Sequence, residues 1–266
     1  MDGTFFRVLF GNPWSQDHGH RHHIVADLAF LKTSRFDNAT QKPFVVFGKE
    51  NRDRLDDLGF KCLMVERRPM PFSGKSLLCN KLLACETASP MFRDAVFLDI
   101  DCHQIAPLPG DFWDACRSKG DLQIPLYRKW YSPAKWRTDE DGRKYIPCSC
   151  YVYMRGSNST KRLTRLALRM IKDGHDVSND EIVFAMHIDL TRGGWRGVAE
   201  YAKVHEPKYY HRWCKMKTFR NQTPVFCHYG RAAQALRALK AAGVDCRSEA
   251  TILKAMSDGK IPQLGG

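Results

Sequence analysis

The stretch Arg93-Asp94-Ala95-Val96-Phe97-Leu98-Asp99-Ile100-Asp101 decides the fold class of this sequence. The strand that we expect over Ala95–Asp99 is apolar until its last residue, as in a strand that is covered on both faces of a sheet. Asp99 and Asp101 are two residues apart, so on an extended chain their carboxylates point to the same side. In parallel α/β sheets, ligands bind beyond the carboxyl ends of the strands. The stretch therefore predicts a buried strand that presents two carboxylates to a ligand.

Strand and helix patterns alternate on both sides of this central strand. Further strands are expected at 5–10, 44–47, 61–65, 122–126, 148–154 and 225–228. Helices are expected at 23–36, 51–58, 77–87, 160–172 and 180–187, with two more in 231–257 that break near Gly243. In the helix at 77–87, one apolar stripe contains Leu78, Leu82 and Cys85, and the polar, aromatic and basic residues 127–147 are interpreted as a loop. Alternation of this kind predicts βαβ units and a largely parallel sheet. We interpret residues 1–230 as one α/β domain and residues 231–266 as a helical extension packed on it.

The composition is that of a globular and strongly basic chain. Of the 266 residues, 43% are hydrophobic and 11% are aromatic, which argues against an intrinsically disordered chain. The 42 Lys and Arg residues against 29 Asp and Glu give a net charge of +13, which favours a nucleotide, a nucleic acid, an acidic glycan or a membrane surface as partner. No apolar run approaches the roughly 20 residues that span a bilayer, and the first residues lack a signal-peptide pattern. We therefore expect a cytoplasmic protein, which for a viral chain means the cytoplasm of the host.

Ten cysteines are present, and no two of them form a CxxC pair. In a cytoplasmic protein such cysteines are expected to be reduced thiols, most of them packed in the core. The alternative is a zinc site with ligands among Cys148, Cys150, Cys214 and Cys227, whose spacing is poor for such a site.

Asp99 and Asp101 carry the predicted chemistry. Two carboxylates at the end of a buried strand are unfavourable unless a positive charge lies between them. A hard divalent cation, Mg²⁺ or Mn²⁺, prefers such oxygen ligands. The cation would bridge the diphosphate of a nucleotide and offset the negative charge that builds on the leaving group. The alternative interpretation is an ordinary acidic turn after a strand.

Two neighbouring segments together resemble a known enzyme family. Asn80-Lys81-Leu82-Leu83, followed by the stretch 93–101, is similar to the core of the glycogenin-like transferases of glycosyltransferase family 8. In that family a Lys-Leu pair opens a helix just before the strand that delivers an Asp-x-Asp motif. The resemblance implies the GT-A fold, a single domain with a mixed and mainly parallel central sheet. It also implies a nucleotide-diphosphate sugar donor, most often a UDP-sugar, in a site that includes Lys81 and Ile100.

Later segments match the same family in the family's order, within residues 5–230. His228-Tyr229-Gly230 resembles a His-Phe-x-Gly segment, which implies that His228 is the third protein ligand of the metal, beside Asp99 and Asp101. Two carboxylates and one imidazole suit Mn²⁺ better than calcium. The resemblance also implies that Gly230 lies in the donor site. The Lys-Pro-Trp that often follows the histidine is absent, and Arg231 is expected to contact phosphate instead.

Two further segments complete the predicted donor site. Ser149 corresponds to the serine of an Asn-Ser-Gly motif on a strand, although Cys148 and Cys150 replace its neighbours and leave the orientation of donor or acceptor open. Gly11 and Asn12 follow the first strand and would lie under the nucleotide. An ordinary turn is the alternative for this pair.

The resemblance implies a reaction that retains the anomeric configuration. Lys81 would draw charge onto the departing diphosphate while the acceptor hydroxyl attacks. Asp180 and Glu181 open a helix where the family has Asp-Gln near the reacting sugar. Asp180 would orient the sugar or stabilise the positive charge that develops on it. If the enzyme inverts instead, Asp180 or Glu181 would act as the general base.

The acceptor side is predicted from segments that combine cations with aromatic rings, because cations hold phosphates while flat rings stack on bases or sugars. The residues are Arg128, Lys129, Trp130, Trp136, Tyr210, Arg212 and Trp213. The helix at 160–172 adds a basic face, for which a solvated surface is the simpler interpretation. These features fit a polyanionic acceptor such as hydroxymethylated pyrimidine in DNA, which the enzyme would extrude from the duplex. Glycan, lipid-linked and protein acceptors stay open.

Two other classes of function fit parts of the sequence. One is a GT-A scaffold that has lost catalysis and binds nucleic acid. The other is a metal-dependent nucleotidyltransferase, which also places paired carboxylates after a strand. A nucleotidyltransferase needs a glycine-rich, basic loop after the first strand, and Gly11-Asn12-Pro13 is a poor version of it.

Overall fold

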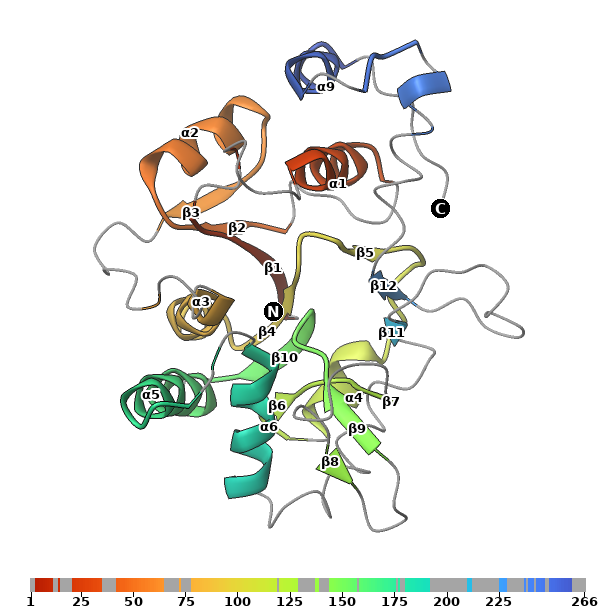
Figure 1. The fold of residues 1–266 in the computed structure, drawn as a ribbon. Helices are drawn as coiled ribbons and strands as arrows, with labels where there is room; N and C mark the ends of the chain where they lie inside the picture. Colours follow the sequence, from red (N-terminus) through yellow and green to blue (C-terminus); the bar gives the residue numbers. More distant parts are fainter. Residues whose placement is uncertain are drawn as a thin grey trace. The chain divides into compact units, whose positions relative to one another are not determined.

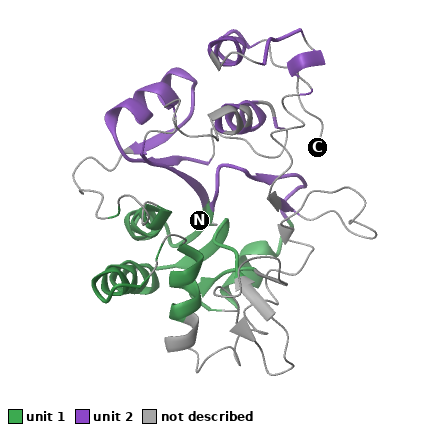
Figure 2. Cartoon of the chain, viewed as in Figure 1, with its two compact units in different colours: residues 1–4, 68–97, 109–206 green, residues 5–67, 98–108, 207–266 purple. Residues whose placement is uncertain are grey.

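The contacts within the computed structural model divide the chain into two compact units (Figure 2). Unit 1 contains residues 1–4, 68–97 and 109–206, and unit 2 contains residues 5–67, 98–108 and 207–266. The structure describes residues 3–11, 14, 21–34, 42–64, 72, 78–118, 120–128, 137–138, 144–156, 158–175, 177, 180–191, 210–211, 225–228, 237, 239–241, 243–246 and 249–259. The expected boundary between residues 230 and 231 lies outside the described residues and stays a prediction.

A six-stranded mixed sheet, mostly parallel, defines the α/β class that the sequence predicts. Its strand order is β3-β2-β1-β4-β10-β6 (Figure 1). The strands are β1 (Thr4–Leu9), β2 (Phe44–Val46), β3 (Cys62–Met64), β4 (Asp94–Leu98), β6 (Leu122–Gln123) and β10 (Tyr151–Arg155). β1, β2 and β3 pair in parallel, whereas β10 and β6 pair antiparallel. The α/β class with a largely parallel sheet is therefore confirmed.

Unit 2 packs its helices around one apolar core. The helices are α1 (Arg21–Thr33), α2 (Lys49–Asp57) and α9 (Glu249–Ser257). Leu28 of α1, Val46 of β2 and Leu55 of α2 belong to the same buried cluster as Ile252 and Met256 of α9. Burying these side chains removes apolar surface from water, which stabilises the unit. The C-terminal helix is thus part of the core of unit 2.

Unit 2 also contains a small second sheet of order β11-β12-β5. Its strands are β5 (Cys102–Gln104), β11 (Tyr210–His211) and β12 (Phe226–His228). β12 pairs antiparallel with β5, with His228 opposite Cys102 and Cys227 opposite His103. The strand expected at 225–228 is confirmed, and its partner β5 follows β4 after a single turn.

The described residues of unit 1 form four helices beside its part of the main sheet. They are α3 (Asn80–Ala88), α4 (Phe112–Arg117), α5 (Asn158–Lys172) and α6 (Asp180–Thr191). α5 packs against both α3 and α6. Leu163, Ala167 and Met170 of α5 are buried at helical spacing, so one apolar stripe fixes the helix and leaves the opposite side in water.

Three sequence expectations in unit 1 are wrong in detail. Within residues 127–147, the described residues contain strands rather than a loop, and the expected strand at 122–126 divides into two. These strands, β7 (Leu126–Arg128), β8 (Arg137–Thr138) and β9 (Lys144–Pro147), form a sheet of order β7-β9-β8. Each is only two to four residues long, and pairing with a distant partner stabilises it. Leu78 precedes α3 and is 39% exposed, so it does not belong to the buried stripe of Leu82 and Cys85.

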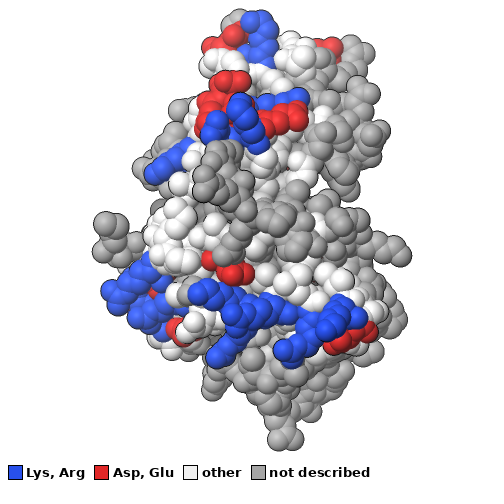
Figure 3. Space-filling view, turned by 90° about the vertical axis from the view of Figure 1, so that its left-hand side faces the viewer, with Lys and Arg blue, Asp and Glu red and all other residues white. Residues whose placement is uncertain are grey.

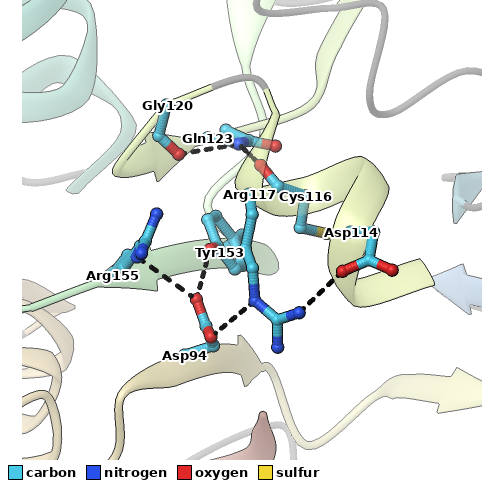
Figure 4. A network of polar contacts seen from close by, with 8 residues as sticks. All are labelled: Asp94, Asp114, Cys116, Arg117, Gly120, Gln123, Tyr153 and Arg155. Atoms are coloured by element: carbon cyan, nitrogen blue, oxygen red, sulfur yellow. Dashed lines mark hydrogen bonds and ion pairs between the residues drawn. The ribbon is translucent and has the colours of Figure 1, made fainter. Parts of the chain in front are cut away.

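A buried carboxylate holds the amino end of β4 (Figure 4). Asp94 accepts a hydrogen bond of 2.6 Å from the Tyr153 hydroxyl and one of 2.9 Å from Nε of Arg117, and Nε of Arg155 lies 3.8 Å away. Burial raises the pKa of Asp94, but the hydrogen bonds from Tyr153 and Arg117 and the two guanidinium charges outweigh it, so the net pKa is lowered. Burial and the same contact with Asp94 raise the pKa of the Tyr153 hydroxyl. This network joins β4, β10 and α4.

Candidate functional site

The Asp-x-Asp motif lies in unit 2, in a tight turn between β4 and β5. The N–H of Cys102 donates a hydrogen bond of 2.9 Å to the carbonyl of Asp99. Ile100 packs against the apolar core of unit 2, while Asp99 and Asp101 on either side are partly exposed. The apolar residue therefore anchors the turn, and the two acidic residues stay accessible. The extended geometry expected for the motif is wrong, because β4 ends at Leu98 and the chain turns at once.

The strand register brings a histidine next to this turn. His228 is the residue of β12 opposite Cys102, and Cys102 directly follows Asp101. The sheet thus sets the backbones of the two segments at the spacing of paired strands, about 5 Å. The side chain of His228 lies outside the described part of the structure. Among the side chains that are described, no group of three or more His, Cys, Asp and Glu residues could hold a metal ion.

A fully buried arginine supports the turn from β1. Arg7 donates a hydrogen bond of 2.9 Å through one guanidinium nitrogen to the carbonyl of Cys102. The N–H of the same cysteine donates the hydrogen bond that closes the turn to the carbonyl of Asp99. The backbone of Cys102 is thus fixed on both sides, which limits movement of Asp101 before it.

A second buried contact supports β5 from helix α1. Nε2 of His103 and Oδ1 of Asp27 are joined by a hydrogen bond of 2.9 Å, and both side chains are buried. The ring of Phe30 lies 4.4 Å from the His103 ring, measured between centroids. Because Phe30 and Asp27 both belong to α1, this helix holds the strand that follows the Asp-x-Asp turn.

Asn51 ties together the carboxyl ends of β1 and β2. Its amide donates hydrogen bonds of 2.9 Å to the carbonyls of Gly11 and Phe47, and its oxygen accepts one of 2.7 Å from the Trp14 indole. Gly11 has a φ of 69°, a left-handed conformation that favours glycine. Asn51 therefore links Gly11, in the loop predicted to lie under a nucleotide, to Trp14 and to the end of β2. Asn12, predicted beside Gly11, lies outside the described residues.

Lys81 and Asp180 form a second cluster, which belongs to unit 1. Nζ of Lys81 lies 3.8 Å from Oδ2 of Asp180 and 6.0 Å from the centre of the Phe97 ring. The Lys81 side chain is 13% exposed, whereas that of Asp180 is 3% exposed. Asp180 is the first residue of α6, as expected, and Glu181 beside it is also buried. Phe97 precedes Asp99 by two residues, so Lys81 contacts the strand that delivers the Asp-x-Asp turn.

The thiol of Cys79 borders this cluster. Burial and, to a lesser degree, the charge of Asp180 raise the pKa of Cys79 to about 12, while the charge of Lys81 acts against them. The thiol donates a weak hydrogen bond of 3.6 Å to the carbonyl of Val177. Cys79 is therefore a neutral, packed thiol at neutral pH.

Ser149 does not lie on a strand, which corrects the sequence expectation. It occupies a turn before β10 and is buried, with Cys148 and Cys150 buried on either side. The N–H of Cys148 donates a hydrogen bond of 2.8 Å to the carbonyl of Pro125. This contact holds the turn and delays the strand until Tyr151.

Several predicted site residues lie outside the described residues or have only their backbone described. Those outside the described residues are Lys129, Trp130, Trp136, Arg212, Trp213, Gly230 and Arg231, together with Cys214 of the alternative zinc site. For Arg128, Tyr210 and Cys227 the structure gives the backbone alone. Seven of the eight cysteines whose side chains the structure describes are buried, as expected for packed thiols. Within the described parts of the chain, no helix is long and apolar enough to cross a membrane.

Comparison with known proteins gives no sequence relative. No family model matches the chain, and no curated protein matches it. Among solved structures it is similar to a glycosyltransferase involved in the glycosylation of the major capsid of PBCV-1, with 10% identity, 88% of this chain and 97% of that chain covered, and a TM-score of 0.45. It is also similar to mouse xyloside xylosyltransferase 1 in its apo form, with 11% identity, 86% of this chain and 98% of that chain covered, and a TM-score of 0.47. A third similar structure is 4-diphosphocytidyl-2C-methyl-D-erythritol synthase from Anaerococcus prevotii, with 12% identity, 69% of this chain and 82% of that chain covered, and a TM-score of 0.36.

Proposed function

We propose that this protein is a metal-dependent transferase that moves a sugar from a nucleotide-diphosphate sugar to an acceptor hydroxyl. One observation carries the proposal. Asp99 and Asp101 flank a core-anchored turn directly after a buried strand, and the strand register brings His228 opposite the next residue, Cys102. A carboxyl-end turn with two accessible carboxylates is where an α/β sheet binds a charged ligand.

The donor set fits a hard divalent cation. Two carboxylates and one imidazole, supplied by Asp99, Asp101 and His228, suit Mn²⁺ or Mg²⁺. Such a cation, when bound, would neutralise charge on the diphosphate leaving group. Arg7 and Ile100 supply the rigidity that the site needs, because both hold the backbone of the turn from the core side.

Lys81 and Asp180 would act on the two halves of the donor. Lys81 is a compact cation that would hold a phosphate oxygen of the nucleotide diphosphate. Asp180 would orient the transferred sugar or balance the positive charge that develops on it. We further propose that the donor is a UDP-sugar and that the reaction retains the anomeric configuration. If the reaction inverts, Asp180 or Glu181 would take the acceptor proton as general base.

The acceptor that we propose first is a hydroxymethylated pyrimidine in DNA, because the chain carries an excess of 13 positive charges. Glycan, lipid-linked and protein hydroxyls are the alternatives. Mass spectrometry of each candidate acceptor, after incubation with mixed sugar nucleotides, distinguishes them. A catalytically inactive scaffold would bind DNA and modify none of them.

Thermal unfolding in the presence of nucleotides tests the donor site. A panel of nucleoside diphosphates at about 100 times the Kd should stabilise the protein by about 2.7 kcal/mol when Mn²⁺ is present. The double variant Asp99→Asn/Asp101→Asn should lose this stabilisation. A control with the same change in charge, Asp57→Asn/Asp111→Asn, alters two exposed residues and should keep it. Stabilisation that needs no metal, or that survives in the Asp99/Asp101 variant, contradicts the proposal.

A separate assay distinguishes the nucleotidyltransferase alternative. Incubation with a nucleoside triphosphate and Mn²⁺ should release no pyrophosphate if the enzyme transfers sugars. Pyrophosphate release that depends on Asp99 and Asp101 would keep the metal site but change the reaction class.

A further inference from the structure

The outer side of helix α5 carries charge that nothing described in the structure neutralises. Figure 3 shows Lys and Arg side chains gathered over unit 1 with few acidic side chains among them. α5 has five cations and no acidic residue in its 15 residues. All five are exposed, and none forms an ion pair with another residue that the structure describes. The five are Lys161, Arg162, Arg165, Arg169 and Lys172.

Helix α2 provides a contrast within the same chain. Its cations are neutralised by acidic residues one helical turn away, so its surface carries both signs of charge. The pairs are Lys49 with Asp53, Arg52 with Asp56 at 3.7 Å, and Arg54 with Glu50 at 2.9 Å. Such i,i+4 pairs stabilise a solvated helix. α5 lacks them, so its surface differs from an ordinary solvated helix face.

The five cations form one stripe along the helix. Residues of an α-helix follow each other by about 100° and 1.5 Å, so the five positions fall within an arc of about 100° and span about 16 Å. The opposite side of α5 is buried, which fixes the direction of the stripe. Leu168, 42% exposed, lies along one edge of it. The charge is therefore arranged as a line on a rigid element.

Positive charge continues past the N-terminal end of α5. Arg93 and Arg155 line a pocket of about 620 Å³ together with Asn158 and Ser159, the first two residues of α5. One acidic residue, Asp121, also lines this pocket. Arg155 is 3.8 Å from Asp94, which is already hydrogen-bonded to two other side chains. Positive charge thus extends from the pocket to the end of the helix.

We propose that this stripe binds the phosphate backbone of a nucleic acid. A line of cations matches a linear polyanion, and the three arginines of α5 can each hold a phosphate through two parallel hydrogen bonds. An anionic membrane fits less well, because an interfacial helix inserts an apolar face, and that face of α5 is buried in unit 1. Binding of this kind would hold a nucleic-acid acceptor on the enzyme, and in that respect it rests on the proposed function. The binding itself needs neither metal nor nucleotide sugar.

Binding of a fluorescein-labelled 20-base-pair DNA duplex, measured by anisotropy at several salt concentrations, tests the proposal. Five phosphate contacts predict a loss of affinity of about 500-fold between 50 and 200 mM salt, whereas two contacts predict about 12-fold. The variant Arg162→Gln/Arg165→Gln/Arg169→Gln should therefore show the weaker salt dependence, with affinity at 100 mM salt lower by on the order of 10²-fold.

A matched control keeps the net-charge change the same. Lys49→Gln/Arg52→Gln/Arg54→Gln on α2 also removes three charges and should leave binding near that of the unaltered protein. Equal weakening by both triple variants would show a general charge effect and overturn the proposal. Absence of DNA binding at 50 mM salt would overturn it as well, and so would a preference for phosphatidylserine vesicles over DNA that depends on α5.

Two variants distinguish a loss of nucleic-acid binding by α5 from a loss of the metal and nucleotide site. The α5 variant should keep the metal-dependent stabilisation by nucleoside diphosphates, which also shows that it is folded. The Asp99→Asn/Asp101→Asn variant should keep DNA binding. DNA binding that is lost in the Asp99/Asp101 variant but kept in the α5 variant would place the nucleic acid elsewhere.

Discussion

Substitution of Tyr153 by Phe should destabilise the protein through a single hydrogen bond. The Tyr153 hydroxyl donates a hydrogen bond of 2.6 Å to Asp94, and both side chains are fully buried. A hydrogen bond to a charged partner contributes about 1.5–3 kcal/mol, and the loss is felt in full where water cannot replace it. We therefore expect the free energy of unfolding to fall by about 1.5–3 kcal/mol at pH 7.

The loss should depend on pH with a definite sign. The pKa of Asp94 is lowered from its ordinary value of 3.8 in the folded protein. A carboxylate of this kind contributes stability above the pKa of the unfolded chain, and this contribution disappears as the pH falls through the folded pKa. Without the Tyr153 hydroxyl the folded pKa rises. The difference between the two proteins should accordingly be constant from pH 7 to about pH 5 and shrink below pH 4.

Urea unfolding followed by tryptophan fluorescence measures this difference, and a double-mutant cycle isolates it. In an Asp94→Asn background, Tyr153→Phe should cost clearly less than in the unaltered protein, because the charged acceptor is gone. Equal losses in both backgrounds would mean that the effect comes from packing and not from the hydrogen bond. A loss below about 0.5 kcal/mol at pH 7 would refute the estimate itself.

Three further substitutions or reactions test other parts of the structure. Asn51→Ala removes three hydrogen bonds at once and should lower the free energy of unfolding by about 2–4 kcal/mol in urea titrations, so that a neutral result would contradict the buried clamp. Gly48→Ala should destabilise by about 1–3 kcal/mol, since Gly48 has a φ of 93°, while Gly110→Ala, with no atom within 4 Å of the added carbon, should be neutral in the same calorimetric scan. Burial raises the pKa of the Cys79 and Cys116 thiols to about 12, so both should resist iodoacetamide at pH 8 until the protein unfolds. Mass spectrometry of tryptic peptides checks this, and alkylation of either thiol in the folded protein would contradict it.

The central strand could be predicted because the polarity of its residues matches their burial. Ala95 to Leu98 are apolar and fully buried, so a short run without polar interruption was enough. The geometry after it could not be predicted from side-chain alternation. Alternation assumes an extended chain, whereas the hydrogen bond from Cys102 to Asp99 closes a turn that tertiary contacts of Ile100 and Arg7 support.

The supporting residues of the site were not predictable for a different reason. Arg7 occupies β1 among apolar neighbours, and its acceptor, the carbonyl of Cys102, is 95 residues away. Asp27 and His103 form a pair across 76 residues, and neither belongs to a local motif. The one available signal is a charged residue inside an otherwise apolar strand, as Arg7 is, because a buried charge must have a partner. Such a signal identifies the residue but not the partner.

Strand β4 divides the requirements for stability and for chemistry between its two ends. The Asp94 network fixes the amino end with buried hydrogen bonds, while the carboxyl end leads into the accessible turn of Asp99 and Asp101. Enzymes often lose activity when their sites are stabilised, because function requires groups that are not fully satisfied. Here the two needs are met five residues apart, one at the start of β4 and the other in the turn that follows it. A protein engineer could therefore strengthen the amino end of β4, and vary the turn of Asp99 and Asp101 after its carboxyl end, with little interference between the two.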